Sequence, residues 1–206
     1  MNAQNKESQA GITPEIALSL LKEGNQRFVS KNMLSRDLIL QMEQTANGQW
    51  PFAVVLGCID SRVPAEIIFD QGLGDIFNAR VAGNFVNTDI LGSIEYGCKV
   101  AGSKLVVVLG HEGCGAVKGA CDNVKLGNIT PMLGNLKQAL DAVTDVTDDR
   151  SSANKEFVQK VVEANVILTV EDVRVQSQVL KEMENDGEIA IVGAVYDVAT
   201  GKVEFK

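Results

Sequence analysis

Three side chains that bind metal ions well, Cys58, His111 and Cys114, are the strongest chemical signal in this sequence. Cys58 follows the run Val-Val-Leu-Gly at 54–57, and His111 follows the same four residue types at 107–110. Both runs are typical of buried strands, and the carboxyl ends of parallel strands gather functional groups at one edge of a sheet. Cys114 lies three residues beyond His111, a spacing at which a tight turn directs an imidazole and a thiolate to one point. We therefore expect two sulfurs and one nitrogen to meet.

Two thiolates and one imidazole are a donor set that suits zinc in tetrahedral geometry. Three protein ligands leave the fourth position to water, as in catalytic zinc sites, whereas four protein ligands make a structural site. Asp60, Cys98 or Cys121 would close the site by supplying the fourth ligand, and spacing alone leaves that alternative open. Taken alone, Cys98 and Cys121 are expected to be buried structural thiols.

Asp60 and Arg62 follow the first cysteine in the sequence Cys-Ile-Asp-Ser-Arg at 58–62. A charge-assisted pair between them would keep Asp60 ionised, off the metal, and oriented to accept a hydrogen bond from zinc-bound hydroxide. The alternative is structural: Asp60 or Ser61 caps a turn and Arg62 forms a surface ion pair. The chain has a single histidine, and its place beside both cysteines and the Asp/Arg pair at two similar strand ends favours the chemical interpretation.

The elements that position these side chains are strands that alternate with helices. Apolar runs predict strands at 52–56, 76–81, 104–109 and 188–195, and Thr200-Gly201 turns the chain back into a final strand at 202–205. The expected fold class is α/β, with a mainly parallel central β-sheet flanked by helices and a C-terminal β-hairpin at its edge. We expect one domain over residues 1–206.

Helical spacing begins before the first strand. Thr13 and Pro14 mark the start of an amphipathic helix over 13–30, and a weaker pattern covers 36–46. The two helices form an N-terminal helical arm at 13–47, after a loose leader at 1–12. Further helices are expected at 88–101 with Thr88 as N-cap, at 116–121, at 131–140, and at 152–184 as two helices with a break near the β-branched run 166–170.

Composition excludes several classes of partner. The chain carries 19 basic and 27 acidic residues, a net charge of −8, and has no Lys/Arg run that would neutralise consecutive phosphates, so no nucleic-acid partner is expected. No stretch approaches the ~20 apolar residues of a membrane span, so no membrane partner is expected either. Four cysteines are too few for a disulfide scaffold, which favours reduced thiols and a cytoplasmic location. A periplasmic location stays open if an export signal has been removed.

The two motifs resemble the paired signatures of the bacterial-type beta-class carbonic anhydrases, Cys-x-Asp-Ser-Arg at 58–62 and His-x-x-Cys at 111–114. The similarity runs from about Leu20 to the carboxyl end and includes segments at 63–66, 80–84, 94–96 and 193–197. The resemblance implies zinc-dependent, reversible hydration of carbon dioxide to bicarbonate and a proton by zinc-bound hydroxide. It implies one Zn²⁺ per chain on Cys58, His111 and Cys114, with Asp60 and Arg62 as the catalytic dyad.

The resemblance also implies a substrate pocket and a partner subunit. The pocket residues that match are Gln49, Phe77, Ala82, Tyr96 and Gly115. In the family the pocket lies at a dimer interface and takes residues from both chains, and the N-terminal arm wraps the partner. A homodimer or a dimer of dimers with a shared active site is therefore expected.

One position departs from a pattern that some bacterial members show. These members carry a tryptophan three residues before the first zinc cysteine, where it supports an inhibitory bicarbonate site, and this chain has Val55 there. Arg80 and Tyr196 match other residues of that regulatory set. Without the tryptophan, Asp60 is expected to stay off the zinc at neutral pH.

Two other functions compete with this interpretation. Carbonyl sulfide and carbon disulfide are linear isosteres of carbon dioxide, and the same scaffold would hydrolyse them if its access tunnel admitted them. A non-enzymatic interaction protein with a closed structural zinc is the second alternative, and it predicts a fourth protein ligand.

Overall fold

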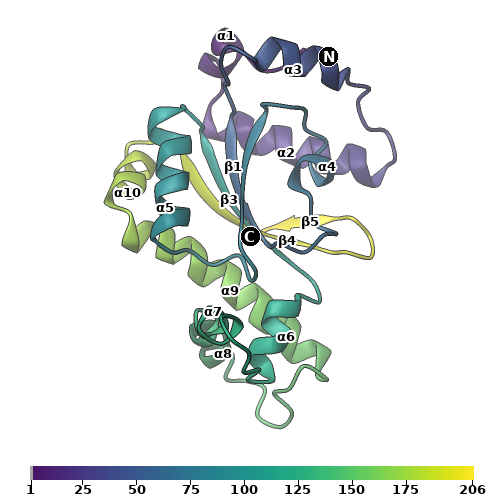
Figure 1. Ribbon diagram of the computed structural model, residues 1–206, viewed down its shortest axis with the longest axis vertical. Coiled ribbons are helices and arrows are strands. Elements are labelled where there is room, and N and C mark those ends of the chain that lie inside the picture. Colours follow the sequence, from purple (N-terminus) through teal and green to yellow (C-terminus); the bar gives the residue numbers. More distant parts are fainter. Residues whose placement is uncertain (1) are drawn as a thin grey trace.

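A five-stranded sheet forms the centre of the computed structural model, which describes residues 2–206 (Figure 1). The spatial order is β2 (Ile76–Arg80), β1 (Ala53–Gly57), β3 (Leu105–His111), β4 (Ala190–Tyr196) and β5 (Val203–Phe205). The first four strands in this order are parallel, and β5 pairs antiparallel with β4. The predicted α/β class, the mainly parallel sheet and the C-terminal hairpin edge are therefore confirmed.

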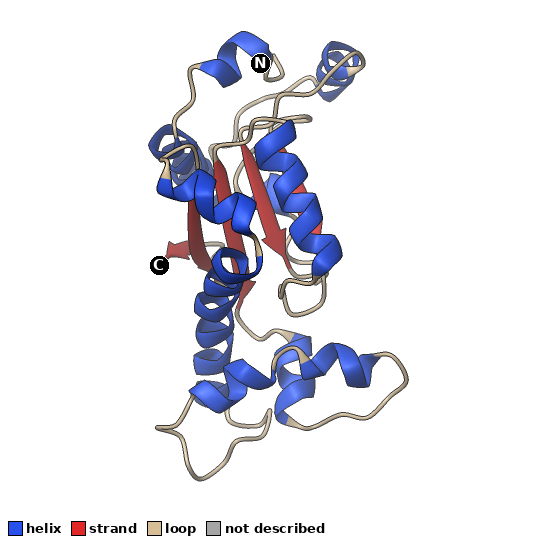
Figure 2. Cartoon of the chain, turned by 90° about the vertical axis from the view of Figure 1, so that its left-hand side faces the viewer, coloured by secondary structure: helices blue, strands red, loops and turns tan. Residues whose placement is uncertain are grey.

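The central strands are buried on both faces, which explains their continuous apolar sequences. Alternate residues of β1 belong to different apolar clusters, because successive side chains of a strand point to opposite faces. Val54 and Leu56 pack in one cluster with helices on one face, whereas Ala53 and Val55 pack in the other cluster with helices on the opposite face. Helices thus cover both faces of the sheet (Figure 2).

The helices fall into groups by position. One face carries α2 (Pro14–Val29) and α4 (Ala65–Ile68), and the other carries α5 (Thr88–Glu95), its π-helical continuation η1 (Tyr96–Val100), α9 (Lys155–Gln176) and α10 (Gln178–Asn185). Beyond the carboxyl ends of the parallel strands lie α6 (Gly115–Cys121), α7 (Ile129–Gly134) and α8 (Lys137–Ala142). At the opposite end of the molecule lie α1 (Lys6–Ala10) and α3 (Leu38–Thr45) (Figure 1).

A buried ion cluster fastens the helical arm to the body of the domain. Asp70, fully buried after α4, accepts hydrogen bonds from Arg27 Nε at 2.5 Å, from the Leu34 amide at 3.2 Å, and from Arg36. Burial opposes the charge on Asp70, but the two guanidinium groups outweigh it and hold the pKa of the carboxyl below its usual value. The end of α2 and the segment before α3 are therefore fixed at one point.

Several element boundaries differ from the sequence-based prediction. The N-cap of α5 is Asn87, whose side chain accepts the Ile90 amide at 2.9 Å, rather than Thr88. The predicted helix at 131–140 is divided into α7 and α8 around Asn135 and Leu136. None of the helices within residues 2–206 is both long enough and apolar enough to cross a membrane.

The two predicted helices are present as α9 and α10, but the predicted break near 166–170 was wrong, because α9 runs through it to Gln176 and the helices are divided at Ser177. Val166 and Val170 are buried against the sheet, so packing outweighs the low helix propensity of β-branched residues. The segment predicted as a loose leader is also more ordered than expected. It contains α1, and Gln9 Nε2 donates to the Pro51 and Ala101 carbonyls at 2.8 Å each.

Candidate metal centre

The fold brings together Cys58, His111 and Cys114 at the carboxyl ends of two neighbouring strands. Cys58 directly follows β1, His111 is the last residue of β3, and the register pairs Gly57 with Leu109. Cys114 occupies the N-cap position of α6, one tight turn after β3. Their ligand atoms all lie within 4.8 Å of one another, and the two sulfurs are 3.9 Å apart. All three side chains are buried.

A single side-chain hydrogen bond of His111 decides which of its nitrogens is available to bind a metal ion. Nδ1 lies 3.0 Å from the Glu112 carbonyl oxygen, which only accepts, so Nδ1 carries the proton and donates it. Nε2 is therefore left with a free lone pair, and it is buried without a hydrogen-bond partner. Leaving a buried polar atom unsatisfied costs about 1–3 kcal/mol. This lone pair is therefore suited to bind a metal ion.

The two sulfurs fit a tetrahedral cation. Their mutual hydrogen bond lowers the pKa of Cys58, whereas that interaction and burial raise the pKa of Cys114. The first thiolate therefore forms easily, and the second needs a positive charge beside it. Zinc–sulfur bonds of ~2.3 Å in tetrahedral geometry place two sulfurs about 3.8 Å apart, close to the distance found here. The donor atoms and their spacing fit zinc.

Asp60 lies beside this group in a pair with Arg62. Arg62 donates to Asp60 Oδ1 from its backbone amide at 3.0 Å and from Nε at 2.9 Å, and to Oδ2 from Nη2 at 2.7 Å. These bonds hold the pKa of Asp60 well below its usual range, although partial burial opposes the charge. Asp60 Oδ2 is 3.9 Å from His111 Nε2. The carboxylate is therefore ionised at the edge of the three ligand atoms.

Two residues hold the loops of the site: Arg80, which was named from the sequence only as part of a regulatory set, and Asn165, which was not named. Arg80, at the end of β2, donates to the carbonyls of Cys58 and Asp60 at 2.7 and 2.5 Å and so clamps the turn that follows β1. Asn165 of α9 donates to the Gly83 carbonyl at 2.8 Å, and the Gly83 amide points at the Cys58 sulfur at 3.5 Å. The available signal for Asn165 was its place among buried valines on the apolar face of a helix.

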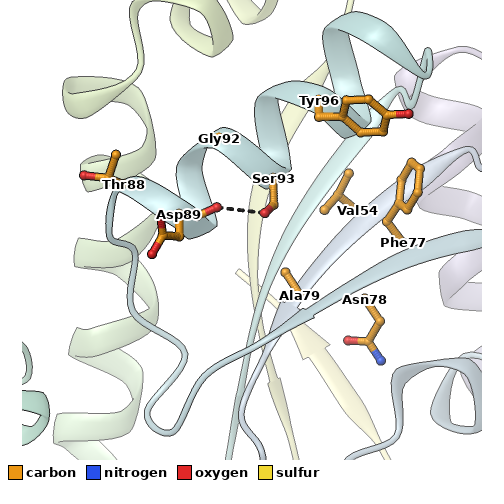
Figure 3. Close-up of a pocket in the computed structure, with 9 residues that line it drawn as sticks. All are labelled: Val54, Phe77, Asn78, Ala79, Thr88, Asp89, Gly92, Ser93 and Tyr96. Atoms are coloured by element: carbon orange, nitrogen blue, oxygen red, sulfur yellow. Dashed lines mark hydrogen bonds between the residues drawn. The ribbon is translucent and has the colours of Figure 1, made fainter.

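The predicted pocket residues separate into two groups. Phe77 and Tyr96 line a cavity of about 650 Å³ between the sheet and α5, with ring centroids 6.3 Å apart in an edge-on arrangement (Figure 3). Val54 lines the same cavity and precedes Cys58 by four residues, about 13 Å along the strand. Gln49 is exposed before β1, beside α3. One chain therefore does not bring these three predicted residues to the metal ligands.

The remaining candidates lie as follows. Ala82, half-buried, adjoins Gly83, and Gly115 is the exposed first residue of α6, next to Cys114. Cys98, in η1, is buried in the core, and Cys121 is half-buried in α6. Burial raises the pKa of Cys98 to about 12 and that of Cys121 to about 11. Among residues 2–206, the group of ligand atoms includes neither cysteine nor Asp60.

Comparisons with known proteins agree with this geometry. The carbonic anhydrase family model matches residues 53–203. The chain is 38% identical to carbonic anhydrase 2 of Mycobacterium tuberculosis over 194 residues, covering 92% of this chain and 91% of that protein. It is also 38% identical to the carbonic anhydrase of Mycolicibacterium smegmatis, covering 94% and 93%.

Solved structures resemble the fold over almost the whole chain. The beta-carbonic anhydrase CafA of Aspergillus fumigatus superimposes with a TM-score of 0.71 at 28% identity, covering 93% of this chain and 89% of that one. A tetrameric beta-carbonic anhydrase of Sordaria macrospora gives a TM-score of 0.69 at 27% identity, covering 93% and 95%.

Proposed function

The chain belongs to the beta-class carbonic anhydrases, and from this membership we propose that it catalyses the reversible hydration of carbon dioxide to bicarbonate and a proton. The proposed cofactor is one Zn²⁺ per chain, held by Cys58 Sγ, His111 Nε2 and Cys114 Sγ. The observation that carries this proposal is the buried, unpartnered His111 Nε2 beside two sulfurs at the spacing of a tetrahedral cation.

An open coordination position distinguishes a catalytic zinc from a structural one. Cys98 and Cys121 lie outside the ligand group, and Asp60 is occupied by three hydrogen bonds from Arg62. Three protein ligands therefore leave one position for water or substrate, which counts against a closed structural zinc. Zinc bound here would supply a Lewis acid that lowers the pKa of water towards ~7.

Asp60 acts on the proton of the attacking water. Because Arg62 keeps the carboxylate ionised, Asp60 Oδ2 accepts a hydrogen bond and fixes the direction in which the oxygen lone pair faces carbon dioxide. Arg62 itself is more than half exposed and serves to hold the carboxylate in place. At neutral pH the pair stays intact and Asp60 remains off the metal.

A second copy of the chain completes the substrate pocket in this proposal. Gln49, Phe77 and Tyr96 lie away from the ligands of their own chain, and Tyr96 is 53% exposed on the surface beside the cavity of Figure 3. A homodimer, alone or paired into a tetramer, would place these residues at the partner's zinc, while Ala82 and Gly115 come from the chain that binds it. The tetrameric Sordaria protein supports an oligomer.

Carbon dioxide is favoured over carbonyl sulfide and carbon disulfide. The relatives and solved structures described above are carbonic anhydrases by name, and the 38% identity to the mycobacterial proteins extends over nearly the whole chain. A cytoplasmic location is proposed on the four cysteines, which are all free thiols. Fractionation of the cells that make the protein tests this location.

Stopped-flow carbon dioxide hydration with zinc quantified in the same sample tests the function. We expect rapid hydration in proportion to zinc content, and loss of both zinc and activity in Cys58→Ser. Cys121→Ser is the matched control, because this thiol lies outside the ligand group, and it should keep both properties. A fully zinc-loaded protein that is inactive at neutral and alkaline pH would overturn the proposal.

A further inference from the structure

A strained loop supplies the hydrogen bond that one of the sulfurs accepts. The loop follows β2, and two consecutive residues in it, Gly83 with φ +86° and Asn84 with φ +41°, occupy the left-handed region. Such backbone persists only where its surroundings hold it, since a non-glycine residue is strained in that region. The amide of Gly83 donates to Cys58 Sγ at 3.5 Å. The position of this donor therefore depends on what fixes the loop.

One side chain from a distant helix holds the loop at this glycine. Asn165 of α9 is 4% exposed, and its Nδ2 donates to the Gly83 carbonyl at 2.8 Å in a buried contact. The two residues are 82 positions apart in the sequence. Substitution at Gly83 is also hindered, because an added Cβ would lie 3.1 Å from Leu136. The loop is thus confined on both sides.

Val166, the next residue of α9, packs against the strand that carries His111. A Cβ added at Gly110 of β3 would come within 2.5 Å of Val166, and one added at Gly193 of β4 within 2.6 Å. The helix therefore lies unusually close to the sheet at the position next to His111. Because α9 cannot move closer to β3, the position of Asn165 relative to that strand is fixed.

We propose that Asn165 is a positioning residue of the metal centre, which sets the Gly83 amide against the Cys58 sulfur. The inference rests on the proposed zinc site. Through α9, the loop that donates to Cys58 is tied to the strand that ends in His111. An amide N–H on a thiolate withdraws charge from the sulfur, and outer hydrogen bonds of this kind orient metal ligands and tune their affinity.

A purely structural role for Asn165 would be to satisfy one buried carbonyl. In that case its removal would lower stability and leave the properties of the bound metal unchanged. Metal affinity and the sulfur-to-metal charge-transfer absorption of the Co²⁺-substituted protein separate the two roles, because both depend on the Cys58 sulfur.

The test compares Asn165→Leu and Asn165→Ala with Thr169→Val, a buried polar control one turn further along α9. Zinc affinity is measured by chelator competition, and the Co²⁺ charge-transfer spectrum is recorded for each protein. We expect both Asn165 variants to lose about 10-fold or more in zinc affinity and to shift the charge-transfer band, with Thr169→Val unchanged in both. Asn165→Ala adds no volume and serves if the leucine variant does not fold.

The outcomes distinguish this inference from the proposed function. If wild type binds zinc and hydrates carbon dioxide but the Asn165 variants match Thr169→Val in affinity and spectrum, Asn165 is only structural. A wild-type protein that binds no zinc would overturn the metal site and this inference with it. A wild-type protein that binds zinc but does not hydrate carbon dioxide would overturn the proposed function. The positioning role of Asn165 would still be tested, because zinc affinity and the Co²⁺ spectrum do not depend on activity.

Discussion

At the scale of single residues, Asp60 accepts a turn-type hydrogen bond and ion-pair hydrogen bonds from the same partner, Arg62. Its carboxylate accepts the Arg62 amide, as a turn-capping residue does, and it also accepts two bonds from the Arg62 guanidinium. The turn and the ion pair therefore hold the carboxylate in one orientation. That orientation leaves Oδ2 near His111 Nε2, where a reacting water would lie.

Asp60→Asn should retain zinc and lose activity. The amide keeps the shape of the side chain but does not accept the proton of the attacking water as an ionised carboxylate does, so we expect kcat/KM to fall by about 100-fold or more. Stopped-flow hydration with metal analysis measures both properties. Asp186→Asn, at an exposed position after α10, is the control. Near-normal turnover in Asp60→Asn would remove Asp60 from the mechanism.

Activity should rise from neutral to alkaline pH. The pKa of Asp60 lies well below its usual range, so this carboxylate is ionised from mildly acidic pH upward and does not cause the change. Two thiolates formally neutralise Zn²⁺, which leaves the metal a weaker acidifier of water than a site with three neutral imidazoles. The pH dependence of kcat/KM for hydration tests this expectation, and a profile flat from mildly acidic to alkaline pH would contradict it.

At the scale of elements, glycines on two strands allow α9 to approach the sheet. Gly110 and Gly193 lie beneath Val166, and both close contacts are with a β-branched side chain that has one preferred rotamer in a helix. The helix is 22 residues long and unbroken. Its continuity and its closeness to β3 give the site a rigid support.

Gly110→Ala should destabilise the domain. The new methyl group would lie 2.5 Å from Val166, so α9 or β3 must shift, and overpacking of this kind costs about 1–3 kcal/mol. Gly134→Ala in α7 is the control, because its added Cβ meets no atom within 4 Å. Urea unfolding measures both free energies. Equal stability of the two variants would mean that the close contact is relieved at no cost.

At the scale of the whole molecule, the predicted site residues occupy different ends of the sheet. The three ligand residues lie at the carboxyl ends of the parallel strands, whereas Phe77 pairs in register with Val54 near the start of β1. Gln49 precedes that strand. We propose that a pocket using both groups takes them from two chains.

Mixed dimers test whether the site is shared. Cys58→Ser removes a ligand and Gln49→Ala removes a pocket residue, so a shared site gives each mixed dimer one intact centre. If Gln49→Ala alone is inactive, random mixing of the two chains should restore about a quarter of wild-type activity, since half of the dimers are mixed. Hydration is measured after co-expression. No recovery, with mixed dimers present, would place both residues in the same chain's site.

The sequence by itself determined the features that local patterns encode. Continuous apolar runs located the buried strands, Thr13 and Pro14 marked the start of α2, and Thr200-Gly201 marked the terminal hairpin. The positions of Cys58 and His111 after similar runs predicted that they would meet, because parallel strands end at the same edge. Each of these predictions rests on a short stretch of sequence, and the structure agrees with each of them.

Tertiary structure decided what depends on residues far apart in the chain. Burial of Val166 and Val170 against the sheet keeps α9 unbroken where β-branched propensity predicted a break. The contact of Asn165 with Gly83 and the separation of Phe77 from the ligands follow from packing, which no local pattern reports. The sequence therefore specified which groups could do the chemistry, and only the packed fold specified what holds them.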